Sequence, residues 1–294
     1  MRHFLTVADL SAREIAELFR AAARLKRSRG KYPRPLRGKV LGLLFQKPSV
    51  RTRVSFEVGM AQLGGQSLYI GPVELQGGQR EAPQDVAQVL SRYLDGIVAR
   101  TFEHRQVEEM AAAASIPVIN GLSDFTHPCQ ALADLFTIQE ALGRLKGVRL
   151  AYVGDGNNVC HALIEACALT GAHLKIATPM THRPRASTLQ RVQWTVDPAE
   201  AVRNAQVVYT DVWVSMGQEK ERRKRQKLFR NYQVNQRLMD RASRGALFMH
   251  CLPAHRGEEV SDEVMDSRAS MVYDQAENRL HVQKALLLML LKGK

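Results

Sequence analysis

The chain of 294 residues contains little cysteine, few aromatic side chains and no long hydrophobic run. Its four cysteines form no Cys-x-x-Cys pair and no regular spacing, which argues against a disulfide framework and against a zinc site. The closing apolar stretch covers only seven residues, 285–291, whereas a helix that spans a bilayer needs roughly 20. The first residues show no secretory or transit signal. We therefore expect a cytoplasmic protein with reduced thiols, no membrane contact and no metal.

Acidic residues are scarce relative to basic ones: 29 Asp and Glu stand against 42 Lys and Arg, a formal net charge of +13. A strongly basic chain can bind nucleic acid. Here the basic residues are spread along the chain, only 6% of residues are aromatic, and no helix-turn-helix, zinc-finger or RNA-binding motif is present. We expect no nucleic-acid partner. An anionic small molecule suits this charge better, because a positive site raises the local concentration of phosphate esters.

Hydrophobic periodicity predicts an α/β protein with two doubly wound parallel-sheet domains joined by helices. Ser11 and Glu14 form a capping box that begins an amphipathic first helix. Short apolar runs, each predicting a strand, alternate with helical spacing at residues 40–45, 68–70, 96–99 and 116–119. After a long helical stretch at 130–142, the strand pattern restarts at 148–153, 174–177, 207–209, 246–249 and 271–273, and a C-terminal helix follows from Lys284. We assign residues 1–130 and a C-terminal helix, 277–294, to the first domain, and residues 131–276 to the second.

The first strand run leads directly into a candidate phosphate site. Ligands of wound parallel sheets bind beyond the carboxyl ends of the strands. Ser49, Arg51 and Thr52 follow residues 40–45 at a predicted helix N-terminus, where free backbone N–H groups and the helix dipole favour an anion. The plainer alternative is that Ser49 is only an N-cap and Arg51 is solvated.

A second polar group occupies residues 127–130. Pro128 fixes the first helical turn and holds His127 extended just before it, and Gln130 lies near the helix start. Two polar side chains then point at one spot, although a lone His before Pro is more often an ordinary loop residue.

Asp211 and Cys251 also follow predicted strands. Asp211 begins a loop that offers Ser215 and backbone groups, where a cationic amine could bind. Pro253 disfavours helical geometry at Leu252, so the carbonyls of Cys251 and Leu252 can face a ligand. A buried small hydrophobe is the commoner role of a free cysteine.

The segment 154–159 imitates the opening of a dinucleotide fingerprint, but Val159 stands at the third glycine position. We therefore do not expect a nicotinamide cofactor. Asn158 lies where a helix N-terminus would attract a carboxylate, which suits a zwitterionic amino acid.

Taken in order, these segments resemble the ornithine carbamoyltransferases over nearly the whole chain. Five motifs carry the resemblance: Gln46–Arg53, Asp124–Gln130, Asp211–Gly217, Phe248–Glu259 and Gln275–Arg279. The resemblance implies transfer of the carbamoyl group of carbamoyl phosphate to the side-chain amine of L-ornithine, giving L-citrulline and phosphate, as in arginine biosynthesis. It also implies an active site in the interdomain cleft, no metal or organic cofactor, and a homotrimer or a higher assembly of trimers.

The same resemblance implies a role for each matching residue. Carbamoyl phosphate would be bound by Ser49, Val50, Arg51, Thr52, Gln76, Arg100, His127, Pro128, Cys129, Gln130, Cys251, Leu252 and Arg279. Ornithine would be bound by Asn158, Asp211, Ser215 and Met216, and the catalytic residues would be Arg100, His127, Asp211 and Cys251.

Two alternatives remain open. A related carbamoyltransferase could act on aspartate, an acylated ornithine or putrescine; aspartate would call for a cationic site where the chain offers residues 211–217. From a different class, the basic segment 218–227 could belong to a nucleic-acid-binding module.

Overall fold

The computed structural model of the chain describes residues 2–28, 34–75, 81–190, 192–215, 217 and 219–292. The chain divides into two compact units: unit 1 is Met1–Leu132 with Asn278–Lys294, and unit 2 is Ala133–Glu277. Both boundaries fall within helices, α6 (Pro128–Leu142) and α13 (Val272–Leu291). The bounds differ by one or two residues from the predicted domains. Each unit contains one wholly parallel sheet, so the predicted fold class is confirmed.

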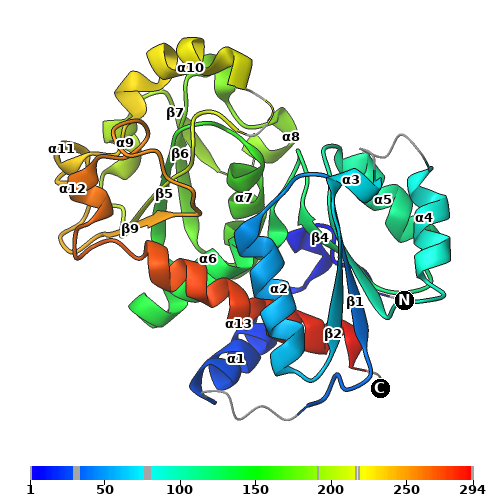
Figure 1. The fold of residues 1–294 in the computed structure, drawn as a ribbon. Helices are drawn as coiled ribbons and strands as arrows, with labels where there is room; N and C mark the ends of the chain where they lie inside the picture. The colour runs from blue at the N-terminus through cyan, green and yellow to red at the C-terminus, as the bar shows by residue number, and fades with distance from the viewer. Residues whose placement is uncertain are drawn as a thin grey trace. The chain divides into compact units, whose positions relative to one another are not determined.

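Unit 1 is built on a four-stranded sheet in the order β2-β1-β3-β4. Its strands are β1 (Val40–Phe45), β2 (Gln66–Ile70), β3 (Gly96–Arg100) and β4 (Val118–Leu122). Its helices include α1 (Ala12–Arg27), α2 (Val50–Gln62), α3 (Pro72–Leu75), α4 (Pro83–Leu90) and α5 (His104–Ala113). The central strand β3 is buried along its whole length because helices cover both faces of the sheet, with α4 and α5 on one side and α2 on the other (Figure 1).

Local sequence explains why α1 begins where it does. The Ser11 hydroxyl accepts a hydrogen bond from the Glu14 backbone N–H at 3.3 Å, and the Glu14 carboxylate accepts from the Ser11 N–H at 2.8 Å. The predicted capping box is therefore confirmed. Ile15, Leu18 and Phe19 then form part of the buried face of the helix.

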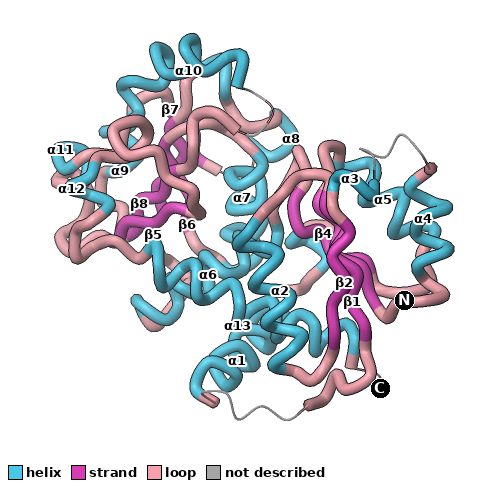
Figure 2. Tube along the Cα trace, in the orientation of Figure 1, coloured by secondary structure: helices cyan, strands magenta, loops and turns pink. Residues whose placement is uncertain are grey.

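Unit 2 is built on a five-stranded sheet in the order β7-β6-β5-β8-β9. Its strands are β5 (Arg149–Val153), β6 (His173–Ala177), β7 (Gln193–Thr195), β8 (Val207–Thr210) and β9 (Leu247–His250). Its shorter helices are α7 (Asn158–Thr170), α8 (Ala186–Leu189), α9 (Pro198–Val202), α10 (Arg222–Phe229), α11 (Gln236–Met239) and α12 (Asp262–Met265). Figure 2 shows these helices around the strands, and the apolar core includes Val208, Phe229 and Phe248.

One predicted strand and one predicted helix boundary are wrong. Residues 271–273 were expected to form a strand, and the final helix was expected to begin at Lys284. Within the described residues this segment forms no strand: an isolated bridge joins Phe248 of β9 to Ser270, and α13 already begins at Val272. A run of three apolar residues is too short to distinguish a strand from a helix start, and Tyr273 is in fact 70% exposed.

The edge strand β7 was not predicted because it is short and carries only partly buried or exposed residues. In the described part of the chain, no helix has both the length and the apolar composition needed to cross a membrane.

The parallel topology determines where the candidate residues lie. In unit 1, Ser49 follows β1, and Arg100 is the last residue of β3. In unit 2, the neighbouring strands β5, β8 and β9 lead to Asn157, Asp211 and Cys251. The carboxyl ends of parallel strands meet at one edge of a sheet, so each unit presents its own group of polar residues there.

Candidate active site

The turn after β1 places hydroxyl groups at the start of α2. Ser49 is the N-cap of this helix: its Oγ accepts from the Thr52 N–H at 3.3 Å and donates to Thr52 Oγ1 at 3.2 Å. The Thr52 side chain is fully buried, and its Oγ1 also accepts from Arg279 Nη2 at 2.7 Å. Because both neighbours donate to Thr52, its own hydroxyl hydrogen remains available for a ligand. Ser49 is thus an N-cap within a larger polar group, and the cap and phosphate interpretations are compatible.

Three guanidinium groups gather around this turn in unit 1. Arg100 is only 7% exposed and donates from Nε to the Lys47 carbonyl at 3.1 Å. The pKa of Arg100 is lowered to about 9, mainly because the side chain is buried and also because Arg279 and Arg51 repel its positive charge. An anion bound here would relieve this repulsion, as expected for a phosphate site.

Arg53 behaves differently from Arg51. It is exposed, its Nε donates to Glu57 Oε1 at 3.0 Å, and its guanidinium lies 3.9 Å from the centre of the Tyr69 ring. Arg53 therefore belongs to the outer surface of α2 and not to the cationic group.

His127 joins the same cationic group from the start of α6. Its carbonyl accepts from the Gln130 and Ala131 N–H groups at 3.1 and 3.2 Å, which fixes the residue at the helix entrance. Burial lowers the pKa of His127 well below its usual value, with further lowering by Arg279, Arg100 and Arg51. The imidazole is therefore neutral at pH 7 and can donate one N–H. Its buried Nδ1 has no hydrogen-bond partner within the described residues.

Two neighbours of His127, Gln130 and Cys129, differ in whether the side chain is available to a ligand. Gln130 is buried on the first turn of α6. Cys129 is fully buried, its thiol donates to the Asn120 carbonyl at 3.5 Å, and burial raises its pKa to about 12. The Cys129 side chain is thus committed to the core of unit 1, and only its backbone could contact a ligand.

In unit 2, Asp211 lies at the centre of a separate polar group. The carboxylate is 5% exposed; Oδ2 accepts from Asn157 Nδ2 at 2.6 Å, and Oδ1 accepts from the Cys251 thiol at 3.0 Å. Burial raises the pKa of Cys251 well above its usual value, and the charge of Asp211 raises it further. Cys251 therefore remains a thiol at neutral pH and orients the carboxylate as a donor, which excludes it as a thiolate nucleophile.

The neighbouring residues Asn157 and Asn158 have different positions and contacts, which the sequence did not reveal. Asn157 is the N-cap of α7: its Oδ1 accepts from the N–H groups of Val159 and Cys160, and its Nδ2 reaches Asp211. Asn158, the predicted ornithine contact, is the first residue of α7 and is half-buried. The signal for Asn157 was its position immediately before an apolar helix, which is typical of an N-cap.

The loop that begins at Asp211 is held in place by α10. Arg225, which is 7% exposed, donates from Nη1 to the Trp213 carbonyl at 2.9 Å and to Asp155 Oδ2 at 2.8 Å. Four residues later, Phe229 stacks on the Trp213 ring with centroids 6.0 Å apart. Burial raises the pKa of Asp155, although Arg225 opposes that shift.

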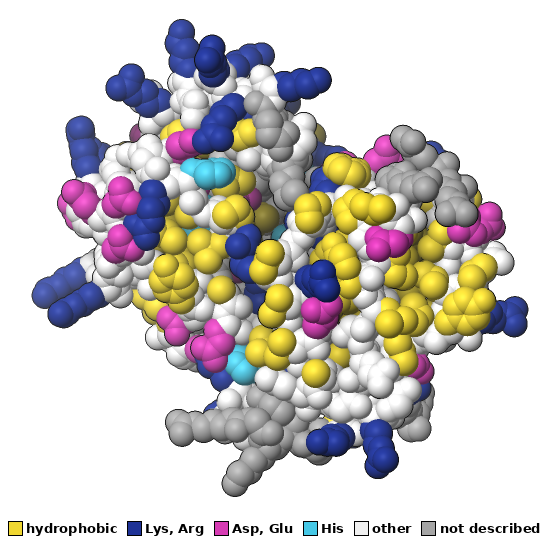
Figure 3. Space-filling model, in the orientation of Figure 1, with side chains coloured by type: hydrophobic (Ala, Val, Ile, Leu, Met, Phe, Trp, Pro, Cys, Tyr) yellow, Lys and Arg dark blue, Asp and Glu magenta, His cyan; other side chains and the backbone are white. Residues whose placement is uncertain are grey.

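In the basic segment 218–227, the Arg225 side chain is therefore buried, whereas several other cationic side chains are exposed. Lys220, Arg223, Lys224 and Lys227 are exposed, and Figure 3 shows Lys and Arg side chains projecting over α10. Residue 218 of this segment lies outside the described residues.

Two predicted site residues also lie outside the described residues: Gln76 and Met216. Ser215, the remaining ornithine candidate, is half-buried in the loop after Trp213.

Asp211, His250 and Cys251 also form a possible metal-ligand group, with ligand atoms within 4.8 Å of one another. Metal binding would require a deprotonated thiol. The Cys251 thiol instead donates to Asp211, and both ring nitrogens of His250 are engaged, one with Glu259 and the other with the Leu252 N–H. The arrangement fits hydrogen bonding better than metal coordination.

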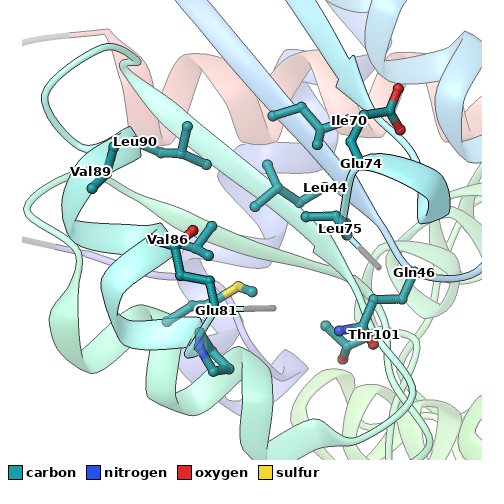
Figure 4. Close-up of a pocket in the computed structure, with 12 residues that line it drawn as sticks. Leu44, Gln46, Ile70, Glu74, Leu75, Glu81, Val86, Val89, Leu90 and Thr101 are labelled. Atoms are coloured by element: carbon teal, nitrogen blue, oxygen red, sulfur yellow. The ribbon is translucent and has the colours of Figure 1, made fainter. Parts of the chain in front are cut away.

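Unit 1 also contains a hollow of about 570 Å³. Figure 4 shows it between α3, α4 and the sheet, lined mainly by apolar side chains such as Leu44, Ile70 and Val86. None of the predicted site residues that the structure describes lines it. Its apolar lining does not suit a phosphate ester, so we do not assign substrate binding to it.

Comparison with known proteins extends over both units. The description "Aspartate/ornithine carbamoyltransferase, carbamoyl-P binding domain" matches residues 2–140, and "Aspartate/ornithine carbamoyltransferase, Asp/Orn binding domain" matches residues 146–290. The ornithine carbamoyltransferase of Nitrosococcus oceani is 52% identical over 297 residues, covering 99% of this chain and 98% of the relative. That of Methanoculleus marisnigri is 50% identical over 301 residues, covering 99% and 97%.

Solved structures give the same result. The ornithine carbamoyltransferase from Pyrococcus furiosus has a TM-score of 0.96 and 50% identity, covering 100% of this chain and 98% of that one. The enzyme from Thermus thermophilus has a TM-score of 0.93 and 44% identity, covering 99% of each chain.

Proposed function

The chain belongs to the aspartate/ornithine carbamoyltransferase family, and we propose that it transfers the carbamoyl group of carbamoyl phosphate to the side-chain amine of L-ornithine. The products are L-citrulline and phosphate. The observation that carries this proposal is the presence of two chemically distinct groups, one in each unit: a cationic group in unit 1 and a buried carboxylate group in unit 2. The first suits a phosphate ester and the second suits an amine.

Carbamoyl phosphate binding is assigned to unit 1. The phosphate accepts hydrogen bonds from the Ser49–Thr52 turn at the N-terminus of α2 and is neutralised by Arg51. The Val50 side chain is 79% exposed, which supports a backbone contact at that position. Relief of the repulsion that lowers the pKa of Arg100 favours the bound anion.

The carbonyl oxygen of the carbamoyl group gains negative charge during attack. Arg100, neutral His127 and Thr52 are assigned to meet that charge as hydrogen-bond donors. Buried, preorganised donors are effective because they need little reorganisation during the reaction, and removing one commonly costs ~3 kcal/mol. The low pKa of His127 supports its role as a neutral N–H donor.

The acceptor amine is assigned to unit 2. The side-chain amine of ornithine should titrate near the lysine value of ~10.4, so it must lose a proton before it can attack. Asp211 binds the amine, and its fixed contacts with Asn157 and Cys251 hold the carboxylate in one orientation. The ammonium releases its first proton to solvent before the attack. Once the new C–N bond forms and the C–O bond to phosphate breaks, the departing phosphate takes the second proton from the same nitrogen.

A direct assay tests the proposal. Purified protein is supplied with carbamoyl phosphate and, separately, with ornithine, aspartate, N-acetylornithine and putrescine, and the carbamoylated product is identified by mass spectrometry. We expect citrulline from ornithine at a rate at least tenfold above the other amines. Aspartate brings a second carboxylate instead of a cationic side-chain amine to Asp211, putrescine lacks the carboxylate that Asn158 at the N-terminus of α7 would attract, and N-acetylornithine lacks the free α-amine of the zwitterion. Transfer to another amine in preference to ornithine would refute the acceptor assignment.

We also propose that the protein acts as a homotrimer in the cytoplasm. Among the exposed apolar side chains of unit 1, four lie on α2, β2 and α3, which supports an interface between copies there: Val50, Val54, Leu68 and Val73. Figure 3 shows hydrophobic side chains gathered over the region of α2, α3 and the adjoining strands. The four free cysteines, all buried, suit a reducing compartment. Light scattering during size-exclusion chromatography should give about 99 kDa, three times the 33.0 kDa chain mass.

A further inference from the structure

The turn after β9 has an unusual backbone that is stabilised from within unit 2. Leu252 has a φ of 60°, in the left-handed region, and the Leu252–Pro253 peptide is cis. This region is unfavourable for a residue that has a Cβ atom. Such a conformation persists only when neighbouring contacts hold it in place.

Those contacts come from the imidazole of His250, which is fully buried. Its Nδ1 accepts a hydrogen bond from the Leu252 N–H at 2.9 Å, and its Nε2 lies 3.2 Å from Glu259 Oε1. Because the Leu252 N–H can only donate, Nδ1 must be the unprotonated nitrogen. The hydrogen is therefore on Nε2, which donates to the carboxylate of Glu259.

Glu259 is itself held firmly. Its side chain is fully buried, and Oε1 also accepts from the His255 N–H at 2.5 Å. Its carbonyl accepts from the Val234 N–H at 2.8 Å, which ties this segment to the chain before α11. The result is a continuous series of hydrogen bonds from carboxylate to imidazole to the Leu252 amide, which we call the relay (Glu259, His250, Leu252).

We propose that Glu259 and His250 are positioning residues that direct the Cys251 and Leu252 carbonyls towards the amino group of carbamoyl phosphate. This inference rests on the proposed function. The relay fixes the peptide between Cys251 and Leu252 through its N–H, and the direction of the Cys251 carbonyl is fixed with it because the peptide is planar. Neither positioning residue contacts the substrate.

The relay therefore determines which acyl phosphate the site prefers. Acetyl phosphate has the shape of carbamoyl phosphate but carries a methyl group where carbamoyl phosphate carries an amino group. Only the amino group can donate to the two carbonyls, so correctly directed carbonyls favour carbamoyl phosphate, and misdirected carbonyls lose that preference. Binding of the phosphate end, assigned to unit 1, should not change.

Two substitutions at one position separate the two bonds of the relay. In His250→Asn, the amide oxygen replaces Nδ1 and can still accept from the Leu252 N–H, whereas the link to Glu259 is lost. In His250→Gln, the amide nitrogen replaces Nε2 and can still donate to Glu259, whereas the acceptor for Leu252 is lost. Glu258→Gln is the matched control, because Glu258 is adjacent but pairs with Arg222 outside the relay.

The dissociation constants of carbamoyl phosphate and acetyl phosphate are measured by titration calorimetry for each full-length variant, together with citrulline formation. We expect His250→Gln to lose about tenfold of the preference for carbamoyl phosphate, the effect of about one hydrogen bond, with acetyl phosphate binding unchanged. His250→Asn, which keeps the acceptor for Leu252 and loses only the link to Glu259, should lose about threefold of the preference, and Glu258→Gln should match the wild type. Equal losses in both His250 variants, or an unchanged preference in His250→Gln, would overturn the proposal.

A variant that fails to fold is replaced by Glu259→Gln. This change keeps an oxygen acceptor and removes only the charge, so it weakens the bond that orients the imidazole. The preference should fall by about threefold, and an unchanged preference would again contradict the relay. If the wild-type chain makes no citrulline, the proposed function itself fails; if it makes citrulline but the variants do not differ, only the relay fails.

Discussion

The buried charge of Arg100 should lower the folding stability of the protein, although the same charge is needed for activity. Its pKa is lowered from 12.5 to about 9, and each pKa unit corresponds to ~1.4 kcal/mol, so keeping the buried guanidinium charged costs roughly 5 kcal/mol of folding free energy. The folded state binds its proton less tightly than the unfolded state. The penalty is therefore complete below the folded pKa and is relieved as the pH rises from there towards 12.5.

Arg100→Met removes the charge and keeps an unbranched side chain. The lost hydrogen bond to the Lys47 carbonyl costs roughly 1.5–3 kcal/mol, which leaves a net stabilisation of ~2 kcal/mol in the protein without substrate. For a chain of 294 residues, that corresponds to an increase of ~3 °C in Tm. Citrulline formation should fall by at least a hundredfold, because one donor to the carbonyl oxygen is lost.

Differential scanning calorimetry without substrate tests the expected rise in Tm, and the citrulline assay tests the expected loss of activity. Arg53→Met is the matched control, since Arg53 is exposed and pairs with Glu57; its stability should change by less than ~0.5 kcal/mol and its activity should be retained. An Arg100→Met protein that is less stable than the wild type, or that remains active, would refute the argument that burial and cation repulsion are offset by substrate binding.

Three further changes test unit 2. Asp211→Asn should raise the ornithine KM and lower kcat while leaving the carbamoyl phosphate KM within about threefold; a change confined to carbamoyl phosphate would show that the two half-sites are assigned wrongly. Arg225→Gln should destabilise the protein by ~3–5 kcal/mol, because it leaves Asp155 buried without its cation. Lys224→Gln on the exposed side of α10 should change the free energy of unfolding by less than ~0.5 kcal/mol, and equal effects in urea titrations would contradict the anchoring role of Arg225. The pKa of Cys251 is raised, and only the thiolate reacts with iodoacetamide. At pH 8 we therefore expect alkylation of this thiol to be at least tenfold slower in the native protein than after unfolding. Equal rates by peptide mass mapping would show that the thiol is not held protonated.

Short-range patterns in the sequence determined most of the secondary structure. Strand β1 has the predicted bounds, and α1 begins at its predicted capping box, because both depend on residues within a few positions of each other. The same patterns failed at Met271–Tyr273, where three apolar residues are compatible with either a strand or the first turn of α13. The family resemblance, which depends on ordered motifs along the whole chain, is confirmed by the matches to both family domains.

The candidate residues were placed at strand ends from the sequence, but their partners could not be. Thr52 and Arg279 are 227 residues apart, and Cys251 and Asp211 are 40 apart, yet each pair is in hydrogen-bond contact. Nothing in the local pattern distinguishes Arg225 from the other cations of α10, since only packing turns one side chain inward. Likewise, nothing in the sequence pairs His250, the last residue of β9, with Glu259 further along the chain; burial at the same point in unit 2 brings the two side chains into contact.

The sequence alone therefore determined the types of group present, their order and the family they indicate, because those follow from local chemistry and motif spacing. Tertiary structure decided which groups form hydrogen bonds with each other, which side chains are kept neutral and which residue is held in an unfavourable backbone conformation. Those properties depend on desolvation and on contacts between residues far apart in the chain, and they arise only when the parallel strands bring their carboxyl ends together.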